Sequence, residues 1–128
     1  MNELLEKFKK DNGFIKHNNY ELENIDKDIV ILKAIIKDEA LNPYKICHGG
    51  FLFGLADTAA GISAVISNQK NAYTIDSNIN YFKPCTGKYV KAISKIIKKG
   101  SNIVNIEVEL INDNDKLVAK AIFNYFYV

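Results

Sequence analysis

Alternation of apolar and polar residues dominates the last third of the chain and predicts β-strands there. In residues 102–111, Val104, Ile106, Val108 and Leu110 are separated by polar or charged positions. A period of two is typical of a strand that buries one face. Comparable patterns, bounded by turn residues, predict further strands at residues 20–25, 28–37, 72–82, 88–98 and 117–128.

Residues 50–67 show a different pattern, because they are apolar on nearly every side. About 18 residues give roughly 27 Å of helix at 1.5 Å per residue. That length approaches a membrane span, but Asp57 lies in the middle of the segment, where a carboxylate would be costly in lipid. We therefore expect a helix buried against a sheet and no membrane association.

A short amphipathic helix is expected at residues 2–11, where Leu4, Leu5 and Phe8 recur at helical spacing, and residues 11–13 are expected to end it with a turn. The predicted order is one or two strands, the long helix, and then four strands joined by short turns. Short connections favour antiparallel neighbours. The sequence thus predicts an α+β fold in one domain, residues 1–128, with a curved antiparallel sheet around one apolar helix.

Composition and charge narrow the function classes. The 128 residues carry a formal net charge of +2, which is too small for the dense basic surface of a nucleic-acid-binding protein and is compatible with an anionic small ligand. The two cysteines, Cys47 and Cys85, and the two histidines, His17 and His48, lack the spacing of a zinc site. We expect reduced thiols, a cytoplasmic location, no signal peptide, and neither a metal nor a redox cofactor.

Asp57 is the residue that most requires an explanation. Asp is unfavourable within a helix and costly in apolar surroundings unless it is paired or solvated. One explanation is a cleft in which the carboxylate attacks a carbonyl or activates water. The other is a structural Asp bonded to a neighbouring strand.

Gly49 and Gly50 open the same helix, where the first backbone amides lack partners within the helix. Such an amide can donate a hydrogen bond to an oxyanion, which contributes on the order of 3 kcal/mol to a transition state. Alternatively, the glycines only give the helix start its backbone freedom.

The distance between Gly49 and Asp57 predicts an assembly. Eight residues separate them, about 12 Å along one helix, so one chain cannot place both beside the same carbonyl. We therefore expect a homodimer with two equivalent sites, each combining Gly49 of one subunit with Asp57 of the other. Two such dimers pairing into a tetramer is a further possibility that the sequence leaves open.

Two sequence motifs resemble the hotdog-fold acyl-CoA thioesterases of the phenylacetic-acid-degradation and 4-hydroxybenzoyl-CoA thioesterase group. The first is Asn-Pro-Tyr-Lys-Ile-Cys-His-Gly-Gly at residues 42–50, followed by Leu-Ala-Asp at residues 55–57. The second is Thr-Ile-Asp-Ser-Asn-Ile-Asn-Tyr-Phe-Lys-Pro at residues 74–84, followed by Gly87. The likeness covers roughly residues 28–128 and implies a hotdog fold.

The resemblance also implies roles for individual residues. Asp57 would be the nucleophile or general base, and the Gly49 amide would polarise the thioester carbonyl, with Gly50 beside the substrate. Asn42 and His48 match the family's loop residues, and Thr74 matches a hydroxyl that orients water or the carboxylate.

Each of the other matched residues also has a structural reading. His48 either acts as a base or braces the loop, and Asn42 either polarises water or only forms the Asn-Pro turn. Thr74 is expected to share a strand face with Asp76, Asn78 and Asn80, a polar stripe that would also suit a solvated edge or a dimer seam.

Lysines near the ends of strands are candidates for binding the phosphates of CoA. They are Lys83, Lys98 and Lys99, with Lys88 nearby. A group of this size is also typical of a solvated surface.

The sequence therefore predicts hydrolysis of an acyl-CoA to a carboxylic acid and CoA. Two alternatives are a hotdog dehydratase acting on hydroxyacyl thioesters and a non-catalytic acyl-CoA-binding module.

Overall fold

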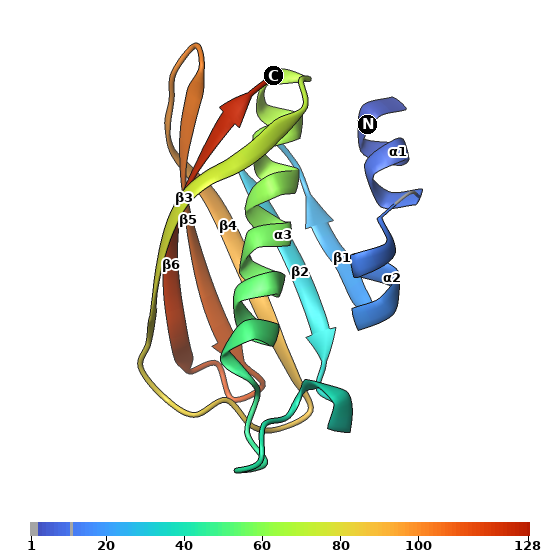
Figure 1. The fold of residues 1–128 in the computed structure, drawn as a ribbon, viewed down its shortest axis with the longest axis vertical. Coiled ribbons are helices and arrows are strands. Elements are labelled where there is room, and N and C mark those ends of the chain that lie inside the picture. Colours follow the sequence, from blue (N-terminus) through green and yellow to red (C-terminus); the bar gives the residue numbers. More distant parts are fainter. Residues whose placement is uncertain (1–2, 11) are drawn as a thin grey trace.

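Six strands form one antiparallel sheet that curves around a single long helix, α3 (Gly49–Asn68) (Figure 1). The computed structural model describes residues 3–10 and 12–128. The architecture confirms the predicted α+β class and hotdog fold. The strands are β1 (Tyr20–Ile25), β2 (Ile29–Ile35), β3 (Ala72–Tyr81), β4 (Tyr89–Lys99), β5 (Ile103–Asn112) and β6 (Leu117–Tyr127).

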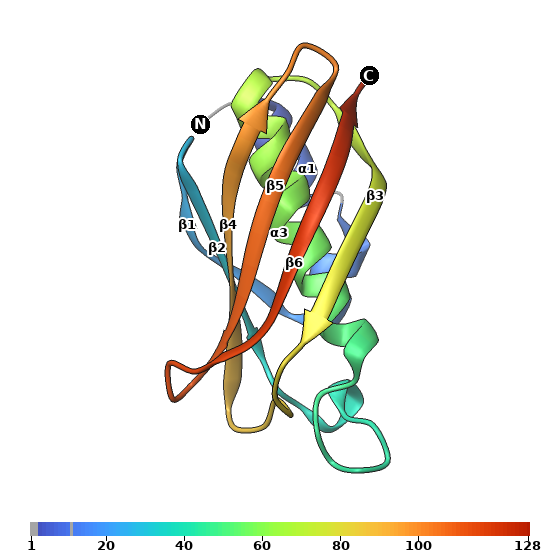
Figure 2. The same ribbon diagram turned by 90° about the vertical axis from the view of Figure 1, so that its left-hand side faces the viewer.

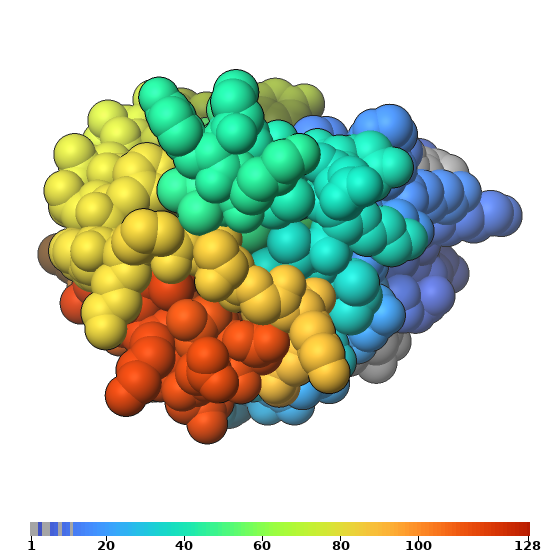
Figure 3. Space-filling view, turned by 90° about the horizontal axis from the view of Figure 1, so that it is seen from below, coloured from blue at the N-terminus to red at the C-terminus, as the bar shows by residue number. Residues whose placement is uncertain are grey.

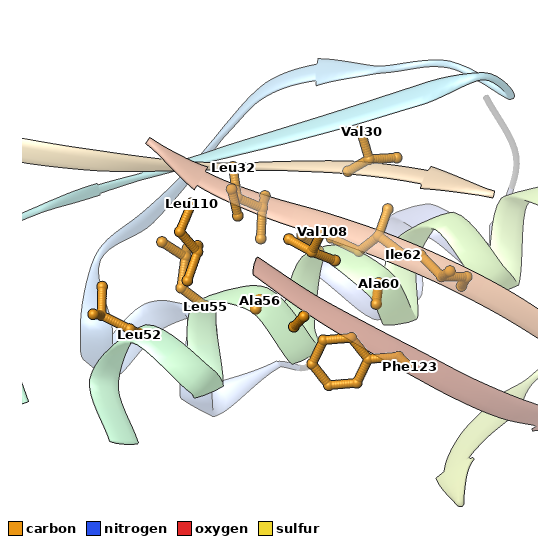
Figure 4. Close-up of a cluster of buried hydrophobic side chains, with 14 of the residues drawn as sticks. Val30, Leu32, Leu52, Leu55, Ala56, Ala60, Ile62, Val108, Leu110 and Phe123 are labelled. Atoms are coloured by element: carbon orange, nitrogen blue, oxygen red, sulfur yellow. The ribbon is translucent and has the colours of Figure 1, made fainter. Parts of the chain in front are cut away.

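The core lies between α3 and the concave face of the sheet, as Figure 4 shows for side chains from both layers. Every second residue of β5 faces α3, and Val104, Ile106, Val108 and Leu110 are fully buried, as their alternation predicts. Val30, Leu32 and Ala34 of β2 are buried in the same way. Helix α3 has the length and hydropathy of a membrane span, but more than half of it is buried in the protein. Its apolar surface therefore packs against the sheet.

The position of β3 differs from the expectation of neighbouring consecutive strands. The strand order is β1-β2-β4-β5-β6-β3, so β3 pairs with β6 and forms one edge of the sheet (Figure 2). The connection from β3 to β4 crosses the end of the sheet to reach the far side of β5. Hydrophobic alternation reports which face of a strand is buried and not which strand is its neighbour. At this edge, one side of β3 pairs with no strand among the described residues.

Two short helices precede the sheet and lie on the side of α3 away from it (Figures 1 and 2). Helix α1 (Glu3–Lys10) confirms the predicted N-terminal helix; the side chains of Leu4, Leu5 and Phe8 lie outside the described part of the structure. The turn expected at residues 11–13 is wrong for residues 12 and 13, which cap and begin a second helix, α2 (Gly13–Asn18); residue 11 lies outside the described residues. Asn12 caps α2, because its Oδ1 accepts the backbone N–H of Ile15 at 3.1 Å.

Backbone hydrogen bonds to two neighbouring segments hold the loop before α3 in place. The backbone N–H of His48 donates to the carbonyl of Ala40, in the 3-10 turn η1 (Asp38–Ala40), at 2.7 Å. The backbone N–H of Cys47 donates to the carbonyl of Cys85 at 2.8 Å. The loop and the β3–β4 connection therefore lie side by side at one end of the molecule (Figure 3). This end carries the glycines that open α3.

Candidate active site

Asp57 is half-buried in α3, and one of its carboxylate oxygens is held by two hydroxyl groups. Oδ1 accepts a hydrogen bond from Thr74 Oγ1 at 2.7 Å and another from Tyr125 Oη at 2.6 Å. Among the described residues, no donor bonds to Oδ2. Two donors on one oxygen orient the carboxylate and leave the other oxygen for a substrate or water. Asp57 thus has hydroxyl partners on two strands and one carboxylate oxygen that bonds to no described residue.

Tyr125 is the site residue that sequence analysis missed. Its side chain is 4% exposed, and its hydroxyl also lies 2.6 Å from the backbone carbonyl of Asp57. Burial, followed by the negative charge of Asp57 and the hydrogen bond to it, raises the pKa of Tyr125. Tyr125 therefore stays a protonated donor. In the sequence, Tyr125 could have been noticed as a tyrosine at an inward-facing position of the alternating segment that forms β6.

The predicted polar stripe is wrong, because a β-bulge after Thr74 places this residue on a different face of β3 from Asp76. Thr74 pairs with the inward-facing Tyr125, but the register shifts before the next pair, Asp76 with Asn124. Asn124 lies on the outer face of β6, and its Nδ2 donates to Asp76 at 3.0 Å. Asp76, and with it Asn78 and Asn80, therefore faces away from α3, whereas Thr74 faces Asp57. Bulges often redirect a side chain next to a functional site in this way.

The Asp57 carboxylate borders a pocket of about 680 Å³. The pocket runs along α3 from Gly50 to Gly61 and is bordered by residues of α2, β3 and β6. Its lining is formed by Asn12, Phe14, Gly50, Phe53, Gly54, Asp57, Thr58, Gly61, Ala72, Tyr73, Thr74 and Tyr125.

The start of α3 provides a second set of functional groups. His48 caps the helix, since its Nδ1 accepts the backbone N–H of Gly50 at 2.7 Å. An accepting Nδ1 carries no proton, so the neutral ring has its hydrogen on Nε2. The Gly49 N–H has no acceptor among the described residues, and the Gly49 carbonyl accepts the Tyr81 hydroxyl at 2.7 Å. Gly49 therefore has an available amide, whereas the Gly50 amide is bonded to His48.

Asn42 and Lys83 lie near Gly49 and line a smaller pocket of about 300 Å³ with it. The Asn42 Oδ1 accepts the backbone N–H groups of Tyr44 at 2.9 Å and Ile46 at 3.4 Å. Asn42 thus forms the turn that the Asn-Pro pair suggests. Its side-chain NH₂ bonds to no other described residue.

The other predicted lysines lie elsewhere. The Lys99 ammonium group donates to the carbonyl of Ser67 at 2.6 Å, near the C-terminal end of α3 and at the opposite end from Gly49. Lys98 is exposed on the adjacent position of β4. The structure therefore groups Lys83 with Gly49 and Asn42 and separates Lys98 and Lys99 from them. Residues 3–10 and 12–128 contain no group of three or more His, Cys, Asp or Glu side chains that could hold a metal.

Gly49 and Asp57 line different pockets of one chain. Both residues belong to α3, so the separation of about 12 Å expected from helical geometry applies to them. Within one chain, the free carboxylate oxygen and the free amide are therefore too far apart to contact the same carbonyl group.

The sequence profile of the thioesterase superfamily matches residues 44–119. The chain belongs to the thioesterase superfamily. This membership confirms the predicted family and enzyme class, a thioester hydrolase. The matched range includes the His-Gly-Gly segment, Asp57 and Thr74 and stops before Tyr125.

Individual relatives agree with this assignment. The chain is 30% identical over 104 residues to the acyl-coenzyme A thioesterase PaaI of Escherichia coli, covering 75% of this chain and 69% of that protein. A putative esterase of Saccharolobus solfataricus is 25% identical over 120 residues, covering 93% of this chain and 86% of the relative.

Solved structures share the fold of this chain. The structure of E. coli PaaI superimposes with a TM-score of 0.91 at 20% identity, covering 96% of this chain and 89% of that chain. A Streptococcus mutans protein solved with acetyl-CoA bound gives a TM-score of 0.81 at 30% identity, covering 86% and 89% of the two chains.

Proposed function

We propose that this protein hydrolyses acyl-CoA thioesters at two sites shared between the subunits of a homodimer. The observation that carries the proposal is the Asp57 carboxylate, with Oδ1 bonded to two hydroxyls and Oδ2 left for reaction. An acyl-CoA thioesterase at 30% identity and a structural neighbour with bound acetyl-CoA support the choice of substrate.

The reaction adds water to the acyl carbon and breaks the carbon–sulfur bond. Asp57 either attacks the carbonyl, giving an anhydride that water then cleaves, or removes a proton from the attacking water. The Gly49 amide donates to the carbonyl oxygen as negative charge develops there. The products are the carboxylic acid and the CoA thiol.

The edge strand β3 supports a dimer as the assembly. Its outer side pairs with no strand in the described part of the chain, and Tyr73, Ile75 and Tyr81 are each about half exposed or more. Edges of this kind favour pairing with another strand. Antiparallel pairing of β3 with its copy around a two-fold axis would direct the start of one α3 toward Asp57 of the partner.

Lys83 is our candidate for contact with CoA phosphate, because it lines the pocket with Gly49. Asn42 would orient the thioester or water through its unbonded NH₂, and His48 would hold the helix start in place. A cytoplasmic location and pairing of two dimers stay predictions.

The test is release of free thiol from short, medium and long acyl-CoAs by the purified protein. Asp57→Asn should reduce turnover about 10²- to 10⁴-fold while the circular dichroism spectrum stays unchanged. Asp28→Asn, an exposed Asp outside both pockets, is the control and should match the wild type. Wild-type rates in Asp57→Asn would reject the assigned role.

The same assay separates the alternative functions. Hydration of crotonyl-CoA without release of thiol would indicate a dehydratase. Binding of acyl-CoA with no turnover of any substrate would indicate a binding module.

A further inference from the structure

The short helix α2 contributes an aromatic side chain to the pocket that contains Asp57. Phe14 is 51% exposed, although its neighbour Ile15 is buried in the core. An exposed phenyl ring in a pocket can contact a bound apolar group. Sequence analysis assigned no function to Phe14.

The contact with Tyr20 holds the Phe14 ring in position. Its ring packs edge-on against Tyr20, with the ring centroids 5.8 Å apart at an interplanar angle of 71°. Tyr20 is itself buried, and its hydroxyl donates to the carbonyl of Phe51 at 3.3 Å. Together with the Asn12 cap and the buried Ile15, these contacts hold α2 against the body of the protein.

Gly54 of α3 provides the space for the ring. A Cβ atom at Gly54 would lie 2.8 Å from two carbons of the Phe14 ring, closer than carbon atoms pack. Glycine weakens a helix interior, so its presence at this position is consistent with the need for a close approach. Gly54 precedes Asp57 by three residues, about 4.5 Å along the helix axis.

The residues that line the pocket extend along α3 on both sides of Asp57, from Gly50 to Gly61. On the Gly61 side, a Cβ atom on this glycine would lie 3.1 Å from the Tyr125 hydroxyl, and the lining includes the largely exposed Tyr73. On the Gly54 side, the lining includes the phenyl side chains of Phe53 and Phe14. These two rings make the Gly54 side the better fit for an apolar chain.

The charge of the residues that line the pocket restricts which acyl groups we expect it to bind. Asp57 is the only charged side chain among the described residues that line this pocket. A second carboxylate on the acyl group would be close to Asp57 without a cation to balance it.

We propose that Phe14, seated on Gly54, is a specificity-determining residue that limits the length of an uncharged acyl chain. The proposal rests on the proposed function, since it assumes that the acyl group of the thioester enters the pocket on the Gly54 side of Asp57. Short chains fit before the ring, which packs one helical turn from Asp57, and longer chains collide with it.

The experiment compares kcat/KM for butyryl-, hexanoyl-, decanoyl- and succinyl-CoA in the wild type and three variants. Phe14→Ala should raise the ratio of decanoyl- to butyryl-CoA about ten-fold, because the obstruction is removed. Phe14→Leu should give a smaller shift. Tyr89→Ala, which removes a ring on the outer face of the sheet beneath the Lys33 ammonium, should leave the ratio unchanged. Succinyl-CoA should be a poor substrate throughout.

A binding measurement tests the role of Phe14 independently of the proposed hydrolysis. The probes are S-butyl-CoA and S-decyl-CoA, thioethers that cannot be hydrolysed, with affinities measured by calorimetry. Phe14→Ala should tighten S-decyl-CoA binding relative to S-butyl-CoA. If this occurs but no thioester is cleaved by the wild type, the length limit stands and hydrolysis is rejected. If the ratio of affinities and the ratio of kcat/KM both stay at wild-type values, the role of Phe14 is overturned.

Discussion

The phenolic oxygen of Tyr125 lies 2.6 Å from Oδ1 of Asp57 and 2.6 Å from the carbonyl oxygen of the same residue. Tyr125 therefore holds both the side chain and the backbone of Asp57. It pairs across the strands with Thr74, the second hydroxyl on Oδ1. The carboxylate is thus oriented from two neighbouring strands at once.

Replacing Tyr125 by Phe should lower kcat about ten-fold and change KM little, because a lost hydrogen bond to a charged group misorients the carboxylate without removing it. Steady-state kinetics of thiol release provide the measurement. Thr74→Val should act in the same direction, and Thr74→Ser should retain activity. Tyr127→Phe is the matched control, since the Tyr127 hydroxyl bonds to Ser67 Oγ outside the pocket. Equal rates in Tyr125→Phe and Tyr127→Phe would contradict this role.

Mixing two inactive variants tests whether the site is shared between subunits. Gly49→Pro removes the free amide at a helix position that accepts proline, and the extended ψ of 136° at His48 suits the residue before a proline. Asp57→Asn and Gly49→Pro subunits, unfolded and refolded together, should regain about a quarter of wild-type activity, because each mixed dimer has one intact site.

Gly49→Ala is the control for that experiment. It keeps the amide and adds the same Cβ, which lies 3.2 Å from the Tyr81 side chain in either variant. Activity should therefore survive in Gly49→Ala better than in Gly49→Pro. No recovery of activity in the mixture would mean that each site lies within one chain.

The buried hydroxyl pair of Ser63 and Ser94 should stabilise the contact between α3 and β4. The two Oγ atoms lie 2.7 Å apart, and both side chains are buried. Ser63→Ala should reduce the free energy of unfolding by about 1–3 kcal/mol, because it leaves the Ser94 hydroxyl without a partner. The double variant Ser63→Ala/Ser94→Ala should cost less than the sum of the two single changes. Urea unfolding of the wild type, the two single variants and the double variant measures these free energies. If the two single changes simply add in the double variant, the two hydroxyl groups are not coupled.

The turn between β1 and β2 should make part of the stability depend on pH. Asp26 Oδ1 accepts the backbone N–H groups of Asp28 and Ile29, both at 2.8 Å. These bonds, first that from Ile29, lower the pKa of Asp26 from its ordinary value of 3.8. Its contribution is thus fully present above pH 3.8 and is lost as the pH falls through the lower folded-state pKa.

Asp26→Ala should therefore unfold at lower urea concentration than the wild type at pH 6, and the difference should shrink at acidic pH. Asp26→Asn keeps an accepting oxygen without a charge, so the gap between Asn and Ala should vary less with pH. A wild-type-to-Ala difference that is constant from pH 6 to pH 2.5 would argue against this source of stability.

Several features of this protein could be predicted from the sequence. The alternation of Val104, Ile106, Val108 and Leu110 gives the buried face of β5, because side-chain direction in a strand depends only on position along the strand. The apolar composition of α3 gives its burial, and an unexplained Asp in the middle gives the candidate site. These are local properties of consecutive residues.

The tertiary structure alone decided where β3 lies and which residues meet Asp57. A bulge after Thr74 turns Asp76 to the outer face, and the crossover of the β3–β4 connection places Thr74 opposite Tyr125. Phe14 reaches the pocket only because Gly54 leaves room for it. Contacts of this kind join residues far apart in the chain. They depend on strand order, register and close packing, which no repeat of hydrophobic residues specifies.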